Sequence, residues 1–180
     1  MDILTKIRAR AKAKLKTIAL PEIEDTRVRE AAKIIEKEGI AKVLLFGRGM
    51  LDKVKQEEYA RKFYELRKLK GISLDDAREI LNDPLYYAAM MTQSGEIDGF
   101  VAGASHTTPD VARAAIQCLG VEEKISIASS CFIMSVPDCP YGKEGAFIFA
   151  DCGIVPEPNS RQLASIAISN AELARKVLGI

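Results

Sequence analysis

The sequence predicts an α/β protein: a parallel sheet flanked by helices, followed by the start of a second, incomplete α/β domain. Three observations support this fold class. Short apolar runs alternate with helical patterns over the first 120 residues, and glycine or proline separates most of these segments. Beyond them, two β-rich apolar runs follow each other with only a turn-rich segment between them. Strands that alternate with helices pair in parallel through crossover connections, so we expect domains at 1–123 and 124–180.

The first βαβ unit begins after a basic stretch at residues 6–16, which is expected to form a solvated helix. A transit peptide or a membrane-surface helix is the alternative for that stretch. The run "KTIALPE" then predicts a buried strand that ends at a proline. Asp25 can cap the following helix and Gly39 can end it, before "AKVLLFG" gives the second strand.

Three further helices and one strand are predicted before residue 120. The first spans residues 56–70 and ends at Gly71. Ser73 caps the next, with Asp76 in its first turn, and a third helix begins at Pro84 and ends at Gly95. "DGFVAG" is then a strand that leads into a loop, which places that loop at the carboxyl end of a strand, where open α/β sheets bind ligands.

That loop, in "VAGASHTTPDVARAAIQ", holds the only histidine of the chain. Gly103 and Ser105 allow close approach of the backbone to a ligand, and Thr108 is the expected N-cap of the next helix. A helix N-terminus attracts anions, so the turn suggests a phosphate site to which His106 could donate. The alternatives are a capped surface helix with a tight entry turn, and a histidine that satisfies a backbone carbonyl.

The last third of the chain predicts two neighbouring strands, in "ISIASSCFIMSV" and "GAFIFADCGIV", and a helix that Asn159 caps with Gln162 three residues later. A helix that follows a buried strand ordinarily crosses to another strand, and no further strand follows here. We therefore expect that residues 146–150 and one face of the last helix lack neighbours, and that the sequence is incomplete.

Composition narrows the classes of function. The chain has 26 basic and 25 acidic residues and a formal net charge of +1, which argues against broad electrostatic capture of nucleic acid. No apolar run of about 18 residues and no secretory signal is present, so we expect no membrane span and a cytoplasmic location. The four cysteines lack metal-site spacing, and reduced thiols without a bound metal are expected.

Five blocks of the chain, in order, resemble consecutive blocks of the phosphate acetyltransferase family, which also includes phosphate butyryltransferase and the C-terminal domain of some malic enzymes. They include "TIALPEIEDTRVREAAKIIEKEGIAKVLLFG", "FYELRKLKGISLDDAREIL", "GEIDGFVAGASHTTPDVARAAIQ" and "SVPDCPYGKEGAFIFADCGIV". The fifth block is "PNSRQLASIAISNAELA". The resemblance covers nearly all of the chain but only a little over half of a family member, and the segment before "FYELR" is shorter here.

The resemblance implies reversible acetyl transfer between coenzyme A and phosphate, giving acetyl phosphate, as part of acetate metabolism. Coenzyme A is then a substrate, no cofactor is held tightly, and the protein is expected to be a homodimer. The partners would be acetyl phosphate, phosphate and coenzyme A, with neither nucleic acid nor membrane. A butyryl-specific relative and a non-catalytic module that binds coenzyme A or phosphate are the alternatives.

The resemblance also implies roles for particular residues. Arg67 and Arg113 match two family arginines that stabilise charge in catalysis, and Cys139 matches a cysteine near the active site. The residues expected to bind substrate are Gly103, Ser105, His106, Thr107, Thr108 and Cys139. From the residues alone, Arg67 could instead cover apolar surface or pair with a carboxylate, and Arg113 could face solvent. The family's catalytic base and its Ser-Arg pair lie in the part that this chain lacks, and Ser160-Arg161 is not their equivalent.

Overall fold

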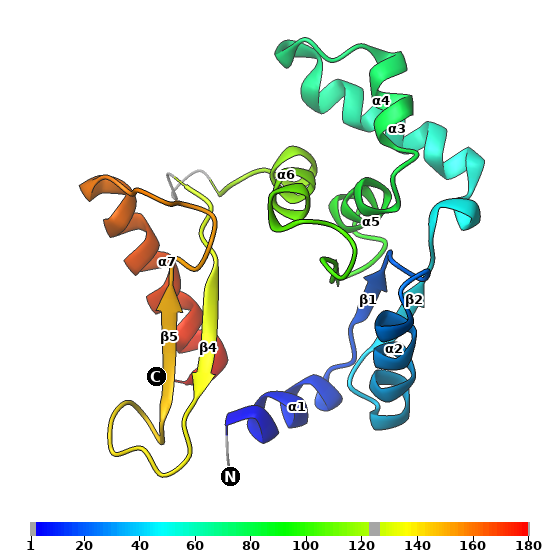
Figure 1. Cartoon of the computed structure of the whole chain (residues 1–180). Coiled ribbons are helices and arrows are strands. Elements are labelled where there is room, and N and C mark those ends of the chain that lie inside the picture. Colours follow the sequence, from blue (N-terminus) through cyan, green and yellow to red (C-terminus); the bar gives the residue numbers. More distant parts are fainter. Residues whose placement is uncertain (1–2, 123–126, 180) are drawn as a thin grey trace. The chain divides into compact units, whose positions relative to one another are not determined.

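The computed structural model describes residues 3–122 and 127–179, and the chain divides into two compact units (Figure 1). One unit is Leu15–Gly120, and the other joins Met1–Lys14 to Val121–Ile180. This division differs from the predicted domain 1–123, because the N-terminal helix belongs with the C-terminal part of the chain. Its apolar residues complete a small core there, which the sequence pattern of the helix alone does not reveal.

The unit Leu15–Gly120 contains the predicted parallel sheet. Its strands are β1 (Thr17–Leu20), β2 (Lys42–Leu45) and β3 (Gly99–Phe100), in the order β2-β1-β3. Both pairings are parallel, with Thr17 opposite Lys42 and Ile18 opposite Gly99. The carboxyl ends of all three strands therefore lie at one edge of the sheet, and the loops that follow them meet there.

Two helices of this unit follow the first two strands of its sheet, one after β1 and one after β2. Helix α2 (Thr26–Glu38) begins at Asp25, whose side chain accepts from the backbone N–H of Arg27, and ends at Gly39 with φ +64°. Both predicted ends are confirmed. After the short 3-10 helix η1 (Arg48–Met50), α3 spans Lys53–Arg67. It begins three residues before the predicted start because Asp52 caps it, and a second 3-10 turn, η2 (Lys68–Lys70), continues it to Gly71.

Three shorter helices complete the unit: α4 (Leu74–Ile80), α5 (Pro84–Gln93) and α6 (Thr108–Leu119). Ser73 and Asp76 form the predicted capping box at the start of α4. At α6 the cap is Thr107 and not the predicted Thr108, because Thr107 accepts from the N–H of Asp110 while the Asp110 carboxylate reaches back to it. The capping box places the helix start one residue earlier than the position of the proline suggested.

Helices α3, α5 and α6 pack around the core of this unit. The rings of Tyr59 and Tyr87 meet edge to face at 5.1 Å between centroids, and those of Phe63 and Tyr86 at 5.8 Å. The largest fully buried side chains are Tyr59, Phe63, Leu81, Leu85 and Met90.

Within its described residues, the other unit contains two strands and two helices: β4 (Cys131–Ser135), β5 (Ala146–Ala150), α7 (Ser160–Leu178) and α1 (Ile3–Ala13). The two strands are neighbours, as predicted, and they pair antiparallel. Part of the predicted strand at 125–136 lies outside the described residues. Asn159 and Gln162 form the predicted capping box at the start of α7.

The two faces of the β4–β5 hairpin differ. On one face, Ile133 and Ile148 pack with Ile3, Ala146 and Leu178 in a small core to which α1 and α7 contribute. The other face presents Phe132 opposite Phe149 and Met134 opposite Phe147. Phe132 is 59% exposed and Phe149 is 55% exposed. No helix among the described residues is both long and apolar enough to cross a bilayer.

Candidate functional site

The loop between β3 and α6 binds an anion, and that anion is the carboxylate of Glu22. Glu22 directly follows Pro21 at the carboxyl end of β1, the strand beside β3. Its Oε2 accepts from the backbone N–H groups of Gly103 at 3.0 Å and Ala104 at 2.9 Å. Its Oε1 accepts from the N–H groups of Ser105 and His106, each at 2.9 Å, and from Ser105 Oγ at 2.9 Å.

Glu22 is 3% exposed, so its charge is held by this loop and not by water. Burial acts to raise the pKa of Glu22, but the hydrogen bonds from Ser105, Ala104 and His106 outweigh it and lower that pKa to about 2. Arg27 holds the same loop from the other side, since its Nη2 donates to the carbonyl of Ala104 at 2.8 Å. The loop is therefore fixed in two ways: its N–H groups donate to the carboxylate of Glu22, and one of its carbonyls accepts from the guanidinium of Arg27.

His106 lies between two carboxylates. Its Nδ1 is 2.7 Å from Glu22 Oε1, and its Nε2 is 3.5 Å from Asp83 Oδ1. Asp83 also caps α5 by accepting from the N–H of Leu85. Because an ionised carboxylate can only accept, the short contact with Glu22 requires a hydrogen on Nδ1. The ring thus links the end of β1, the loop and the start of α5.

These contacts change how the predicted substrate-binding residues can act. The N–H groups of Gly103, Ser105 and His106 all donate to Glu22, so an external phosphate would have to compete with it. Thr107 is engaged in the α6 capping box, and Thr108 is the first residue of that helix. Binding of substrate by these residues stays a prediction, and the side chains that follow them on α6 are the more accessible groups.

Arg113 lies in the second turn of α6 and is 57% exposed at its side chain. Its Nη1 contacts Asp110 Oδ1 at 3.1 Å, one helical turn earlier. An exposed pair of this kind contributes little to stability and can be exchanged readily for another anion. The geometry therefore leaves the guanidinium of Arg113 available to a ligand.

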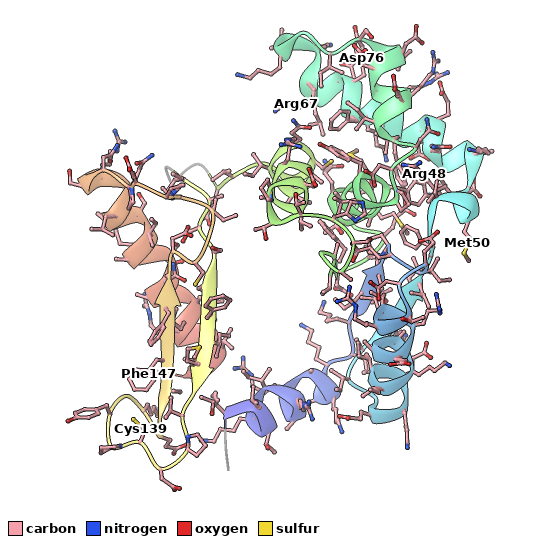
Figure 2. All side chains as sticks on the ribbon, in the orientation of Figure 1. Arg48, Met50, Arg67, Asp76, Cys139 and Phe147 are labelled. Carbon is pink, nitrogen blue, oxygen red and sulfur yellow. The ribbon has the colours of Figure 1, made fainter. Side chains whose placement is uncertain are left out.

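Arg67 is the last residue of α3 and lies where α3 packs on α6 (Figure 2). Its Nε is buried and has no hydrogen-bond partner among the residues that the structure describes. The ion pair with a carboxylate that we considered for this arginine is not among its described contacts. A buried N–H donor without an acceptor costs free energy, so Arg67 is suited to an acceptor supplied by a ligand.

Each arginine acts on one of two side chains that also influence each other, Cys118 on α6 and Tyr86 on α5. Burial raises the pKa of Cys118 to about 12, and the nearby Arg67 opposes that rise. Burial also raises the pKa of Tyr86, with Cys118 adding to the rise and Arg113 opposing it. Arg67, Cys118, Tyr86 and Arg113 therefore form one electrostatically connected group, which we call the arginine patch.

A cavity of about 920 Å³ opens next to this region, and Tyr86 and Asp83 contribute to its wall. Arg48 and Lys53 bring positive charge to it, while Asp83 and two further carboxylates bring negative charge. Neither Arg67 nor Arg113 lines it. Its size suits a drug-sized or nucleotide-sized molecule, but its mixed charge does not make it a site for a bare anion.

Cys139 lies in the connection between β4 and β5, in the unit that does not contain the arginine patch (Figure 2). It is half-buried, and all four cysteines are free. No group of three or more histidine, cysteine or acidic side chains that could hold a metal ion occurs within residues 3–122 and 127–179.

Three carboxylates with specific roles were missed in the sequence. Glu22 and Asp83 hold His106, and Asp151 plays a comparable part in the other unit. It accepts from the N–H groups of Ser130, Gly153 and Ile154 and from Ser130 Oγ. Burial acts to raise the pKa of Asp151, but these hydrogen bonds lower it well below its usual range. The signal available in the sequence was position. Asp151 directly follows the last residue of β5, and Glu22 follows β1 with only Pro21 between them.

Known proteins resemble this chain along its whole length. It is 43% identical over 198 aligned positions to a phosphate acetyltransferase from Acetivibrio thermocellus, covering 99% of this chain and 60% of that protein. A phosphate acetyltransferase from Thermoanaerobacterium thermosaccharolyticum is 41% identical, with 100% of this chain and 61% of that protein covered. Both alignments are longer than 180 positions, so these relatives carry residues within the matched region that this chain lacks.

The solved structures agree. A phosphotransacetylase from Streptococcus pyogenes superposes with a TM-score of 0.84 at 30% identity, over 96% of this chain and 57% of that one. The chain thus spans about 60% of the length of the curated relatives it matches. A protein-family model described as "Phosphate acetyl/butaryl transferase" matches residues 2–180. The chain therefore belongs to the phosphate acetyl/butaryl transferase family.

Proposed function

We propose that this chain serves phosphate acetyltransferase activity, the reversible transfer of an acetyl group between coenzyme A and inorganic phosphate. The observation that carries the proposal is the 43% identity to a protein named phosphate acetyltransferase over 99% of this chain. The arginine patch supports it, because the reaction needs cations for phosphate and for the charge that develops on it.

The reaction needs a base for the thiol, cations or N–H groups for the phosphate, and donors for the developing oxyanion. The thiol of coenzyme A loses its proton to a base, and the sulfur attacks the carbonyl carbon of acetyl phosphate. The bond between that carbon and the bridging oxygen then breaks, and phosphate leaves with the electron pair. Arg67 and Arg113 are assigned to the phosphate and to the transition-state charge, since guanidinium groups bind phosphate oxygens in a bidentate manner.

The base is assigned to residues outside this chain, as the family resemblance implies. Within the chain, His106 is a poor candidate because its two ring nitrogens face Glu22 and Asp83. Ser160 is the first residue of α7 and follows the cap residue Asn159, which suits a structural role at the helix start. We therefore propose that the residues described here supply phosphate contacts and that turnover requires further protein.

Coenzyme A is proposed as a substrate that leaves after each turnover, with no tightly held cofactor. A cytoplasmic location is proposed from the four free cysteines. A homodimer is proposed from the family resemblance, and the exposed apolar face of the β4–β5 hairpin is consistent with burial in an assembly. Light scattering at several protein concentrations tests the oligomeric state.

The test is thioester formation from acetyl phosphate and coenzyme A. The purified 180-residue chain is assayed alone and after addition of the C-terminal part of the Acetivibrio thermocellus relative. We expect no turnover above a heat-treated control in the first case and turnover in the second. Turnover by the chain alone would overturn the assignment of the base. Thermal stabilisation by coenzyme A with no turnover in either case would favour the non-catalytic binding module.

The arginine assignment has its own variants. Arg67→Gln and Arg113→Gln are each expected to lower kcat/KM for acetyl phosphate by roughly 30- to 1000-fold, the range for loss of one group that stabilises transition-state charge. Arg61→Gln is the matched control, because Arg61 lies on α3 and pairs with Glu57 at the surface. Equal kcat/KM in all three variants would contradict the assignment.

A butyryl-specific enzyme is the second candidate, since the family description names both acyl groups. Butyryl exceeds acetyl by two methylenes, and each added methylene changes binding by only about 1–3 kcal/mol, so the sequence carries no sharp mark of acyl preference. Rates with acetyl phosphate and butyryl phosphate, measured in the same assay, decide between the two.

A further inference from the structure

The loop Gly103–His106 has an unusual concentration of donors around one side chain. Four consecutive backbone N–H groups, one hydroxyl and one ring nitrogen all lie within 3.0 Å of the Glu22 carboxylate. Backbone N–H groups that converge in this way form an anion-binding concavity. In P-loops and other phosphate sites the anion in such a turn is a ligand, whereas here it is supplied by the protein itself.

Only a carboxylate of this length satisfies these donors. A carboxylate offers two oxygens and about four lone-pair positions, all of them acceptors. A glutamine would replace one oxygen with an NH₂ group, which would face two or more of the N–H donors. An aspartate is one methylene shorter, so its oxygens could not reach both Gly103 and His106 without movement of the backbone.

The loop connects this carboxylate to the arginine patch. His106 is followed directly by Thr107, which caps α6, and Arg113 lies on that helix. A shift of the loop would therefore move the start of α6 and the His106 ring together. Arg27 adds a second restraint through the carbonyl of Ala104.

We propose that Glu22 is a positioning residue of the site. Its carboxylate sets the path of Gly103–His106 and holds His106 with a hydrogen on Nδ1. It thereby aligns the start of α6, the helix on which Arg113 lies. The positioning of His106 stands on the geometry of this unit alone. The kinetic consequence rests on the proposed function.

The primary test uses the fact that His106 is the only histidine. In a nitrogen-15-labelled chain, long-range proton–nitrogen spectra of the imidazole identify which ring nitrogen carries hydrogen. We expect hydrogen on Nδ1 in the unmodified chain and in the control variant Glu24→Gln. Glu24 is exposed and lies two positions after Glu22, and its substitution makes the same change of charge. In Glu22→Gln we expect that the Nδ1 hydrogen signal is lost or exchanges rapidly with water. Hydrogen on Nε2 alone in the unmodified chain, or identical spectra in both variants, would overturn the proposal.

A second measurement covers the case in which Glu22→Gln does not fold. Amide exchange in the unmodified chain should be about 10- to 100-fold slower at Gly103–His106 than in an unstructured peptide, as expected for charge-assisted hydrogen bonds. Exchange at the unstructured rate would overturn the proposal without any substitution.

The kinetic arm separates this proposal from the proposed function. In the mixture that forms thioester, Glu22→Gln should lower kcat at least about 10-fold while Glu24→Gln leaves it unchanged. If the unmodified protein forms no thioester, the proposed function fails, and the spectra of His106 still decide whether Glu22 positions the loop. Unchanged kcat in Glu22→Gln together with a changed His106 spectrum would overturn the alignment of α6.

Discussion

The two units of this chain bury apolar side chains to very different extents. Leu15–Gly120 encloses Tyr59, Phe63 and Leu81 completely, within a core to which several helices contribute. The unit formed by α1, β4, β5 and α7 has a small core, and the outward face of its hairpin leaves Phe132 and Phe149 more than half exposed. Yet both units fix a loop with a buried or half-buried carboxylate, Glu22 in one and Asp151 in the other. In this protein, the fixing of a loop by hydrogen bonds to a carboxylate therefore does not depend on how large the apolar core of its unit is.

The largest effect expected is on the core of Leu15–Gly120. Phe63→Ala should lower the free energy of unfolding by about 3–5 kcal/mol, because it removes a fully buried ring and leaves a cavity. Phe149→Ala, at a ring that is 55% exposed, should cost less than about 1 kcal/mol. Denaturant unfolding followed by tyrosine fluorescence suits the first unit, since four of the five tyrosines lie in it. Similar losses in both variants would contradict the contrast between the units.

Acid should affect the Glu22 loop next. The pKa of Glu22 in the folded state is about 2, against an ordinary value of 4.5. Its stabilising contribution is thus complete above about pH 4.5 and is lost as the pH falls from there toward 2. The difference corresponds to about 3 kcal/mol. Unfolding of the unmodified chain and of Ser105→Ala, which keeps the charge but removes one donor, should be measured between pH 6 and pH 2.5. A flat stability across that interval would show that the loop does not depend on ionised Glu22.

A glycine in each unit gives a third comparison. Gly145 has φ +74°, and a Cβ added there would lie 2.0 Å from the carbonyl oxygen of Val136. Gly39, in the other unit, has φ +64° with nothing within 4 Å of such a Cβ. Gly145→Ala should cost roughly 2–3 kcal/mol, since backbone strain and a clash add, whereas Gly39→Ala should cost only about 1 kcal/mol, from the left-handed backbone alone. Thermal unfolding measures both, and equal losses would mean that the hairpin connection adjusts freely.

The smallest effect should be the same in both units. Thr107→Ala and Asn159→Ala each remove the side chain of a capping box, at α6 and at α7. Each loss should be about 1 kcal/mol, because a cap acts on its own first turn. Denaturant midpoints with each variant test this, and a difference of several kcal/mol would show that one helix depends on its unit more than the other.

The sequence allowed local features to be predicted better than distant ones. The caps at Asp25, Ser73 and Asn159 were correct because a cap depends on residues only two or three positions away. The cap of α6 was placed one residue late because two threonines are adjacent there. The antiparallel pairing of β4 and β5 was left undecided, since a long connection is compatible with either direction.

The candidate site was predictable only in part for the same reason. The anion-binding character of the Gly103–His106 loop followed from its residues, but the identity of its anion did not. Glu22 is 81 to 84 positions away, and only the pairing of β1 with β3 brings it under the loop. Likewise, the burial of Arg67 Nε depends on the packing of α3 against α6. Such features arise from tertiary structure and leave no local pattern.

The loop that Glu22 holds has a consequence for the thermodynamics of ligand binding. Because the protein's own carboxylate already orders Gly103–His106, the conformational entropy of that segment is lost during folding and not when a ligand arrives. A ligand that reaches the arginine patch meets a surface whose backbone is already in place. Association should then proceed at the rate of an ordinary diffusional encounter, without a slow phase for loop closure.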